Sequence, residues 1–163
     1  RFVWPDADIP VLPLAFPPDW SPAQLMALGA ALAPLTQQGV LVYATGSLTH
    51  NLRLLFGPGP RPALDAPEIP QSAAFRQWFA QRGAAADWPA LQDYRRQAPH
   101  AALMHPTDEH LLPLYVAAGA AGVLPQAVRL HGSLTYGCLA MDAFAFGSGA
   151  PALAQRVGAA EAV

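Results

Sequence analysis

The stretch SPAQLMALGAALAPLTQQGVLVYATGSLTHN, residues 21–51, decides the fold class. Its first part carries helix signals, because Ser21 is a good N-cap, Pro22 suits the first helical position and Gly39 suits a helix end. The continuous apolar run at residues 40–44 is typical of a strand buried on both faces. A helix that leads directly into such a strand indicates an α/β protein.

Residues 9–16, IPVLPLAF, come before this helix and have enough aliphatic and β-branched residues for a short strand at an edge. Strand, helix and strand together form a β-α-β unit. We therefore expect a mostly parallel or mixed sheet flanked by helices. Residues 127–146 predict one or two terminal strands.

The middle of the chain predicts helices around a proline-rich loop. Residues 57–70 are a loop, either the rim of an active site or an inserted connection. Two amphipathic helices follow at residues 72–97, with a break near Gly83, and another helix starts near Pro113. Most aromatic and apolar residues of the first two helices are expected in the core: Phe75, Trp78, Phe79, Trp88, Leu91 and Tyr94.

Composition excludes several classes of function. The chain has 163 residues, 53% hydrophobic and 12% charged, which fits one domain, and no apolar run is long enough to span a membrane. A net charge of −2 gives no general attraction to nucleic acid or anionic lipid. All basic residues are arginines, which excludes Schiff-base lysine chemistry and a Walker-type phosphate loop.

The single cysteine, Cys138, cannot form an internal disulfide, so we expect a reducing, cytoplasmic location and a buried structural thiol. The sequence opens without an initiator methionine or a signal peptide, as if the numbering began part-way through a protein. We expect a domain at residues 1–146 and a loose or weakly helical tail at residues 147–163.

Two of the five histidines, His50 and His110, each lie where a strand or loop meets a helix start, which is where ligands collect in open α/β sheets. Histidine is the commonest metal ligand and the usual acid–base group near neutral pH. We therefore consider both for a single site. The other three are better explained as structural polar residues: His100, His105 and His131.

Asp108 and Glu109 directly precede His110, and two roles are open for them. They complement a helix start, or one of them completes a set of two histidines and a carboxylate for non-haem Fe(II). Ser47 and Thr49 beside His50 could suggest a nucleophile and base, but no G-x-S-x-G elbow is present.

Two motifs carry a family resemblance: GSLTHNL at residues 46–52 and HPTDEHLLPL at residues 105–114. With their flanks, from about residue 4 to residue 146, they resemble the carboxyl-terminal part of the 4,5-DOPA extradiol dioxygenases. These are LigB-type class III extradiol ring-cleavage dioxygenases. The resemblance implies that a catechol ring is opened beside its hydroxyls with O₂, using Fe(II), with zinc possible in the isolated protein.

The resemblance also implies roles for single residues. His50 corresponds to a catalytic acid–base residue or metal ligand, and His110 to a metal ligand, with Glu109 a weaker candidate. Candidates for holding the catechol or its carboxylate are Asn51, Arg53 and Tyr136.

The family's amino-terminal His-Gly-Ser and Ser-x-His motifs have no counterpart in the amino-terminal part of this sequence, ahead of GSLTHNL. The chain therefore resembles the second half of a larger three-layer α/β domain. We expect its metal site to be incomplete and the fragment alone to be inactive, with the missing amino-terminal half as a partner. The alternatives are a non-catalytic binding protein or inactive fragment on this fold, or a metal-dependent hydrolase, which would need more carboxylate ligands.

Overall fold

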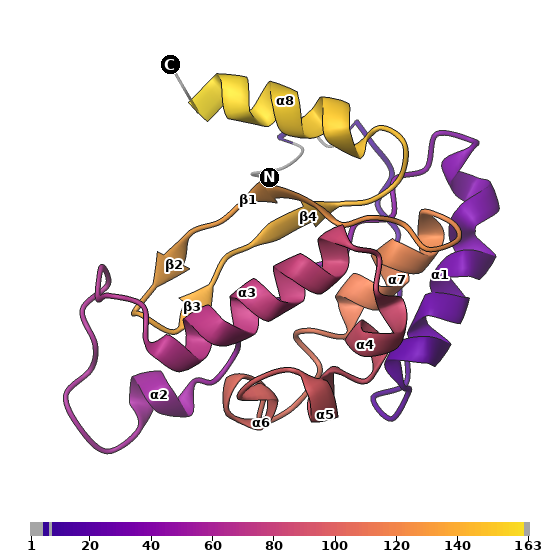
Figure 1. The fold of residues 1–163 in the computed structure, drawn as a ribbon. Helices are drawn as coiled ribbons and strands as arrows, with labels where there is room; N and C mark the ends of the chain where they lie inside the picture. The colour runs from indigo at the N-terminus through magenta and orange to yellow at the C-terminus, as the bar shows by residue number, and fades with distance from the viewer. Residues whose placement is uncertain (1–4, 7, 162–163) are drawn as a thin grey trace.

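The computed structural model describes residues 5–6 and 8–161, in which helices surround short strands. The helices are α1 (Pro22–Thr36), α2 (Arg53–Phe56), α3 (Pro70–Ala84), α4 (Trp88–Gln92), α5 (Tyr94–Gln97), α6 (Ala101–Met104), α7 (Pro113–Ala120) and α8 (Ala150–Glu161). The strands are β1 (Val128–His131), β2 (Leu134–Thr135), β3 (Leu139–Ala140) and β4 (Ala143–Ala145). Strand β1 pairs with β4, and β2 pairs with β3, both antiparallel. Figure 1 shows these strands as a ribbon between α3 and α8.

The α/β class is confirmed, but two predicted strands do not form ladders. Residues 9–16 and 40–44 are extended or irregular, and no strand pairs with either of them in the described part of the chain. The strand pairs at residues 128–145 are antiparallel rather than parallel. The reason is that a strand exists only through hydrogen bonds to a neighbour, and apolar composition does not supply the neighbour.

The predicted limits of α1 are confirmed by its capping. The Ser21 hydroxyl accepts a hydrogen bond from the Gln24 amide at 3.3 Å, and the Gln24 side chain accepts one from the Ser21 amide at 2.9 Å. Gly39 follows the helix with a φ of +83°, which favours glycine. Pro113 is the first residue of α7, as its missing amide hydrogen requires.

Helix α1 packs closely against α7 because each contributes a glycine to the contact. A Cβ at Gly29 would lie 2.1 Å from the Val116 carbonyl oxygen, and one at Gly119 would lie 2.1 Å from the Met26 carbonyl oxygen. The two backbones therefore touch with no side chain between them. This contact fixes α7, whose first residue, Pro113, comes three positions after His110.

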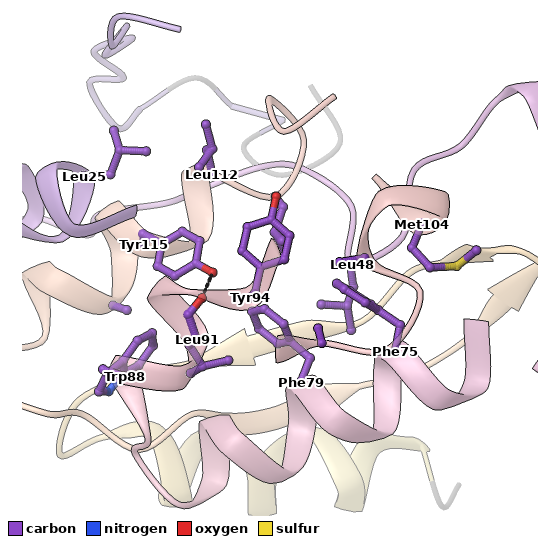
Figure 2. Packing of buried hydrophobic residues seen from close by; sticks show 14 of the residues in the cluster. Leu25, Leu48, Phe75, Phe79, Trp88, Leu91, Tyr94, Met104, Leu112 and Tyr115 are labelled. Atoms are coloured by element: carbon purple, nitrogen blue, oxygen red, sulfur yellow. Dashed lines mark hydrogen bonds between the residues drawn. The ribbon is translucent and has the colours of Figure 1, made fainter. Parts of the chain in front are cut away.

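The core lies between α3, the short helices α4 to α6, and α7 (Figure 2). As predicted, Phe75, Phe79, Trp88 and Tyr94 are buried there, whereas Trp78 is only partly buried. The Trp88 indole donates to the Pro125 carbonyl at 2.9 Å, whereas the buried Tyr94 hydroxyl has no hydrogen-bond partner in the described part of the chain. The core thus supports the short helices that come directly before the second motif.

The predicted proline-rich loop is confirmed, since no helix or strand lies between Phe56 and Pro70. At the other end, the residues predicted to form a loose or weakly helical tail form a helix, α8, over Ala150–Glu161. This helix contacts β1 and β4. The domain limit at residue 146 stays a prediction. No helix in the described ranges is long and apolar enough to cross a membrane.

Candidate metal centre

The loop with the first motif lies directly against the second motif. The Ser47 amide donates to the His110 carbonyl at 2.8 Å. A Cβ at Gly46 would lie 2.0 Å from that same oxygen, so only glycine fits this close approach. The glycine and serine of the first motif thereby bring two segments into contact that are about sixty residues apart in the sequence.

The loop is also anchored to the β2–β3 hairpin through Thr49. Its buried hydroxyl donates to the Cys138 carbonyl at 2.8 Å and accepts from the Ala140 amide at 2.8 Å. The Ser47 hydroxyl donates to the Thr49 carbonyl at 2.8 Å. Both hydroxyls are therefore engaged with the main chain, which argues against a nucleophile–base pair with His50. Cys138 is buried, and burial raises the pKa of its thiol, in agreement with a structural thiol.

A third anchor holds the loop to α6. The His50 amide donates to the Met104 carbonyl at 2.9 Å, and the Asn51 side-chain amide donates to the Leu103 carbonyl at 2.6 Å. The Asn51 side-chain oxygen accepts from the Arg53 amide at 3.0 Å, which starts α2. Asn51 is buried and holds the loop in place.

These anchors bring the rings of His50 and His110 together. The rings stack with centroids 3.5 Å apart and planes 17° from parallel. One possible ligand atom from each of His50, Glu109 and His110 lies within 4.8 Å of the other two. We call these three residues the histidine cluster. Burial, and next the charge of His110, lower the pKa of His50, while Glu109 acts in the opposite direction.

Glu109 supports the His110 ring from one side. Its Oε1 accepts a hydrogen bond from the Thr107 hydroxyl at 2.9 Å and lies 3.1 Å from His110 Nδ1. A hydrogen bond from its own main chain, helped by Thr107 and His110, lowers the pKa of the Glu109 carboxyl. When Nδ1–H donates to this carboxylate, the Nε2 lone pair of His110 is left for a metal ion.

Asp108 has a different neighbour from Glu109. Its carboxylate forms an ion pair with Arg95, and its carbonyl accepts the amides of Leu111 and Leu112. Arg95 also donates to the His105 carbonyl at 2.6 Å. Asp108 therefore supports the turn before α7, and Glu109 is the carboxylate of the cluster.

His105, the first residue of the second motif, is fully buried under the loop. Its Nε2 lies 2.7 Å from the Leu48 carbonyl, so this nitrogen carries the hydrogen and donates it. Its Nδ1 is buried without a partner in the described part of the chain, and burial lowers the pKa of His105 to about 4. This placement agrees with the prediction that His105 is a structural polar residue. Apart from the position of His105 in the second motif, nothing in the sequence predicted its hydrogen bond to the Leu48 carbonyl.

The other predicted residues lie outside the histidine cluster. Arg53 is exposed at the start of α2, and Tyr136 lies in the β2–β3 turn with a φ of +55°. The Arg61 guanidinium lies 4.7 Å from the centroid of the Tyr136 ring and donates to its hydroxyl at 2.8 Å. His100 precedes α6 and His131 ends β1, and neither belongs to the cluster.

Two imidazoles and a carboxylate whose possible ligand atoms lie this close together fit a divalent metal ion. Histidine nitrogen and carboxylate oxygen are the donors of non-haem Fe(II) sites, and they also suit zinc. Their separation of under 4.8 Å allows one ion to contact more than one of them. The geometry thus fits part of a metal site.

The sequence also matches a known protein family. The family described as the catalytic LigB subunit of aromatic ring-opening dioxygenase matches residues 1–144. A 4,5-DOPA dioxygenase extradiol of Beta vulgaris is 35% identical over 146 residues, which are 90% of this chain and 52% of that protein. Proteins with the same description from Mirabilis jalapa and Escherichia coli are 32% and 29% identical, over 81% and 72% of this chain and 47% and 42% of theirs.

A solved structure of an uncharacterized protein from Escherichia coli K12 superposes with a TM-score of 0.69 at 26% identity. The match covers 85% of this chain and 56% of that one. The chain therefore spans about half the length of the relatives it matches. Since the family match covers most of the sequence, including both motifs and the histidine cluster, the chain belongs to the LigB family of aromatic ring-opening dioxygenases.

Proposed function

We propose that the protein to which this chain belongs opens the ring of a DOPA-like catechol beside its hydroxyls, with incorporation of O₂. The observation that carries the proposal is the stacked pair of His50 and His110 next to Glu109. The extradiol dioxygenase descriptions of the relatives support the reaction class. The single buried thiol fits a cytoplasmic location.

In this proposal His110 binds a metal ion through Nε2, with its ring held by Glu109. When bound, Fe(II) would supply the redox and Lewis-acid chemistry that ring cleavage with O₂ needs, and zinc could take the same ligands in an isolated protein.

His50 is the proposed acid–base residue, with a ligand role as the alternative. Its lowered pKa keeps the ring neutral near pH 7, so a ring nitrogen can accept a proton from a catechol hydroxyl. The stacked His110 ring limits how far His50 can turn. Holding the base in one orientation is itself a catalytic contribution.

The histidine cluster contains two imidazoles and one carboxylate. Oε1 of that carboxylate already accepts a hydrogen bond from Thr107 and lies within hydrogen-bond distance of His110 Nδ1. We propose that further ligands come from the amino-terminal half of the domain and that this chain alone is inactive. A metal ion held by two histidines only would be weakly bound.

Substrate contacts are proposed for Arg53, Asn51 and Tyr136. Arg53 is the strongest of these, because it lies three residues after His50 and its guanidinium has no acidic partner in the described structure. A guanidinium suits the carboxylate of an amino-acid catechol.

The test uses the full-length protein loaded with Fe(II) under anaerobic conditions and then mixed with L-DOPA and air. We expect O₂ consumption together with a yellow ring-opened product. His50→Ala should keep its circular dichroism spectrum and lose activity by at least about 100-fold. His131→Ala, which changes an exposed histidine outside the cluster, serves as the matched control.

Near-normal turnover by His50→Ala would refute the catalytic role of His50. If the Fe(II)-loaded protein cleaves no catechol but still binds one, the protein is a binding protein on this fold. If His110→Ala keeps full metal content, the ligand role moves from His110 to Glu109.

A further inference from the structure

The proline-rich loop at residues 57–69 lies against the β2–β3 turn. The Tyr136 amide donates to the Leu64 carbonyl at 2.8 Å, and the Ile69 amide donates to the Gly137 carbonyl at 2.9 Å. A Cβ at Gly137 would lie 2.5 Å from a carbonyl oxygen of the loop, so the two backbones touch. The loop therefore has a fixed place beside this turn.

An ion-pair network holds the carboxyl end of the loop. The Arg76 guanidinium of α3 contacts Glu68 at 2.8 Å and Asp142 at 2.8 Å, and the Asp142 side chain is only 1% exposed. The Ser72 hydroxyl also donates to Glu68 at 2.8 Å. Charge-assisted hydrogen bonds of this kind fix the geometry of their partners, so the loop is anchored to α3 as well as to the turn.

Arg61, near the start of the loop, is oriented but not neutralised. Its Cζ lies 5.3 Å from the centroid of the Phe56 ring and 4.7 Å from that of Tyr136, and it donates to the Tyr136 hydroxyl at 2.8 Å. This hydrogen bond uses one of the five N–H groups of the guanidinium. Arg61 forms no ion pair with an acidic residue in the described part of the chain. Its charge is therefore available to an anionic ligand.

Tyr136 has a backbone conformation that is uncommon for a tyrosine. Its φ of +55° lies in the left-handed region, which favours glycine. Strained residues of this kind persist where surrounding contacts hold them, and they cluster at ligand-binding sites. Here the bond from its amide to Leu64 is one such contact, and the result is a ring and hydroxyl held beside Arg61.

The aromatic partners of Arg61 connect it to the loop that carries His50. Phe56 is the last residue of α2, which begins three residues after His50 and is about 6 Å long. Figure 1 shows α2 and the β2–β3 hairpin at the same end of the molecule.

A second connection runs through the hairpin. Tyr136 is two residues from Cys138, whose carbonyl accepts the hydrogen bond from Thr49, the neighbour of His50. In an amino-acid catechol the carboxylate and the hydroxyls lie at opposite ends of the molecule. A partner for the carboxylate is therefore expected beside the histidine cluster, not within it.

We infer that Arg61 is a specificity-determining residue that binds the carboxylate of an amino-acid catechol, and that Tyr136 positions its guanidinium. The inference rests on the proposed function for the class of substrate. It makes Tyr136 a residue that acts through Arg61, because the Tyr136 hydroxyl already accepts a hydrogen bond from it. Arg53 is the competing cation, and the test separates the two.

Equilibrium dialysis of the zinc-loaded, full-length protein under argon tests the assignment with L-DOPA and with dopamine, which lacks the carboxylate. We expect the parent to bind L-DOPA more tightly than dopamine. Arg61→Gln should reduce this preference at least about 10-fold, because a charge-assisted hydrogen bond is lost. Arg61→Lys keeps the charge and should keep part of the preference, and Tyr136→Phe should reduce it less than Arg61→Gln does. Arg156→Gln, at an exposed arginine of α8, is the matched control and should keep the parental preference.

An equal preference in Arg61→Gln and the parent would overturn the inference, and so would a parent protein that does not favour L-DOPA. A preference that is lost in Arg53→Gln but kept in Arg61→Gln would assign the carboxylate to Arg53 and would also overturn it. The dialysis uses no turnover. A protein that shows the Arg61-dependent preference but opens no ring would therefore refute the proposed function and leave the role of Arg61 standing.

Discussion

Acidification should destabilise the protein through His105, the buried histidine under the loop. Its pKa is lowered to about 4 by burial, against an ordinary value of 6.5 in the unfolded chain. The unfolded state therefore takes up the proton first. The stabilisation is complete above pH 6.5 and is lost as the pH falls from 6.5 toward 4.

The magnitude follows from this difference. One group with these two pKa values lowers the free energy of unfolding by about 1 kcal/mol between pH 7 and 5.5, and by about 2 to 3 kcal/mol by pH 4.5. Solvent does not screen the charge of this group, because His105 is 0% exposed. The physical cause is that Nδ1 would carry the proton in a site with no acceptor and with the Arg95 guanidinium nearby.

The assay is urea unfolding of the full-length protein between pH 7.5 and 4.5, followed by tryptophan fluorescence. His105→Gln keeps an amide that can donate to the Leu48 carbonyl but cannot take up a proton. We expect this variant to be less stable than the parent at pH 7 and to lose the part of the pH dependence due to His105. His131→Gln, at an exposed histidine, is the matched control for replacing a histidine by glutamine.

An unchanged pH dependence in His105→Gln would show that another group takes up the proton. His50 is the first alternative, because burial lowers its pKa as well. A pKa of His105 near 6.5 in the folded protein, measured by NMR, would refute the reasoning directly.

Three further predictions concern the anchors of the histidine cluster. Gly46→Ala should cost about 1 to 3 kcal/mol in urea unfolding and weaken metal binding, because its Cβ would lie 2.0 Å from the His110 carbonyl oxygen. Thr49→Val should cost about 2 to 5 kcal/mol, because it leaves a buried carbonyl and a buried amide unpaired, whereas Thr49→Ser should cost about 1 kcal/mol. Glu109→Gln should keep the metal stoichiometry but weaken metal affinity about 10- to 100-fold in a zinc titration, because the carboxylate supports the His110 ring. Complete loss of metal in this variant would instead make Glu109 a ligand.

Local signals in the sequence predicted where α1 and α7 begin. The start of α1 depends on the Ser21 cap and on Pro22, both of which act within one turn. Pro113 fixed the start of α7 in the same way. The terminal strands predicted at residues 127–146 formed, but the two earlier ones did not. Residues 40–44 have the composition of a strand, yet no strand pairs with them in the described part of the chain.

The candidate site was predictable in its residues but not in its geometry. His50 and His110 stood out because of the motifs, and the structure brings their rings together. The sequence could not show that Asp108 and Glu109 have different partners, because the two residues are adjacent in the chain. Only the fold shows that Asp108 forms an ion pair with Arg95. The sequence also gave no sign that Tyr136 is engaged by Arg61, since that contact joins residues 75 positions apart.

The first motif is better understood as a holder for one side chain than as a set of reactive groups. Gly46 contacts the backbone at His110, Thr49 is bonded to the β2–β3 hairpin and Asn51 to the end of α6, which leaves His50 as the residue that reaches the cluster. Three separate anchors around one histidine limit its movement more than any single bond would. Since the stacked rings are only 3.5 Å apart, a small displacement of the loop changes where a metal ion or a substrate proton can be held. Loss of one anchor should therefore reduce metal affinity and turnover more than its effect on unfolding suggests.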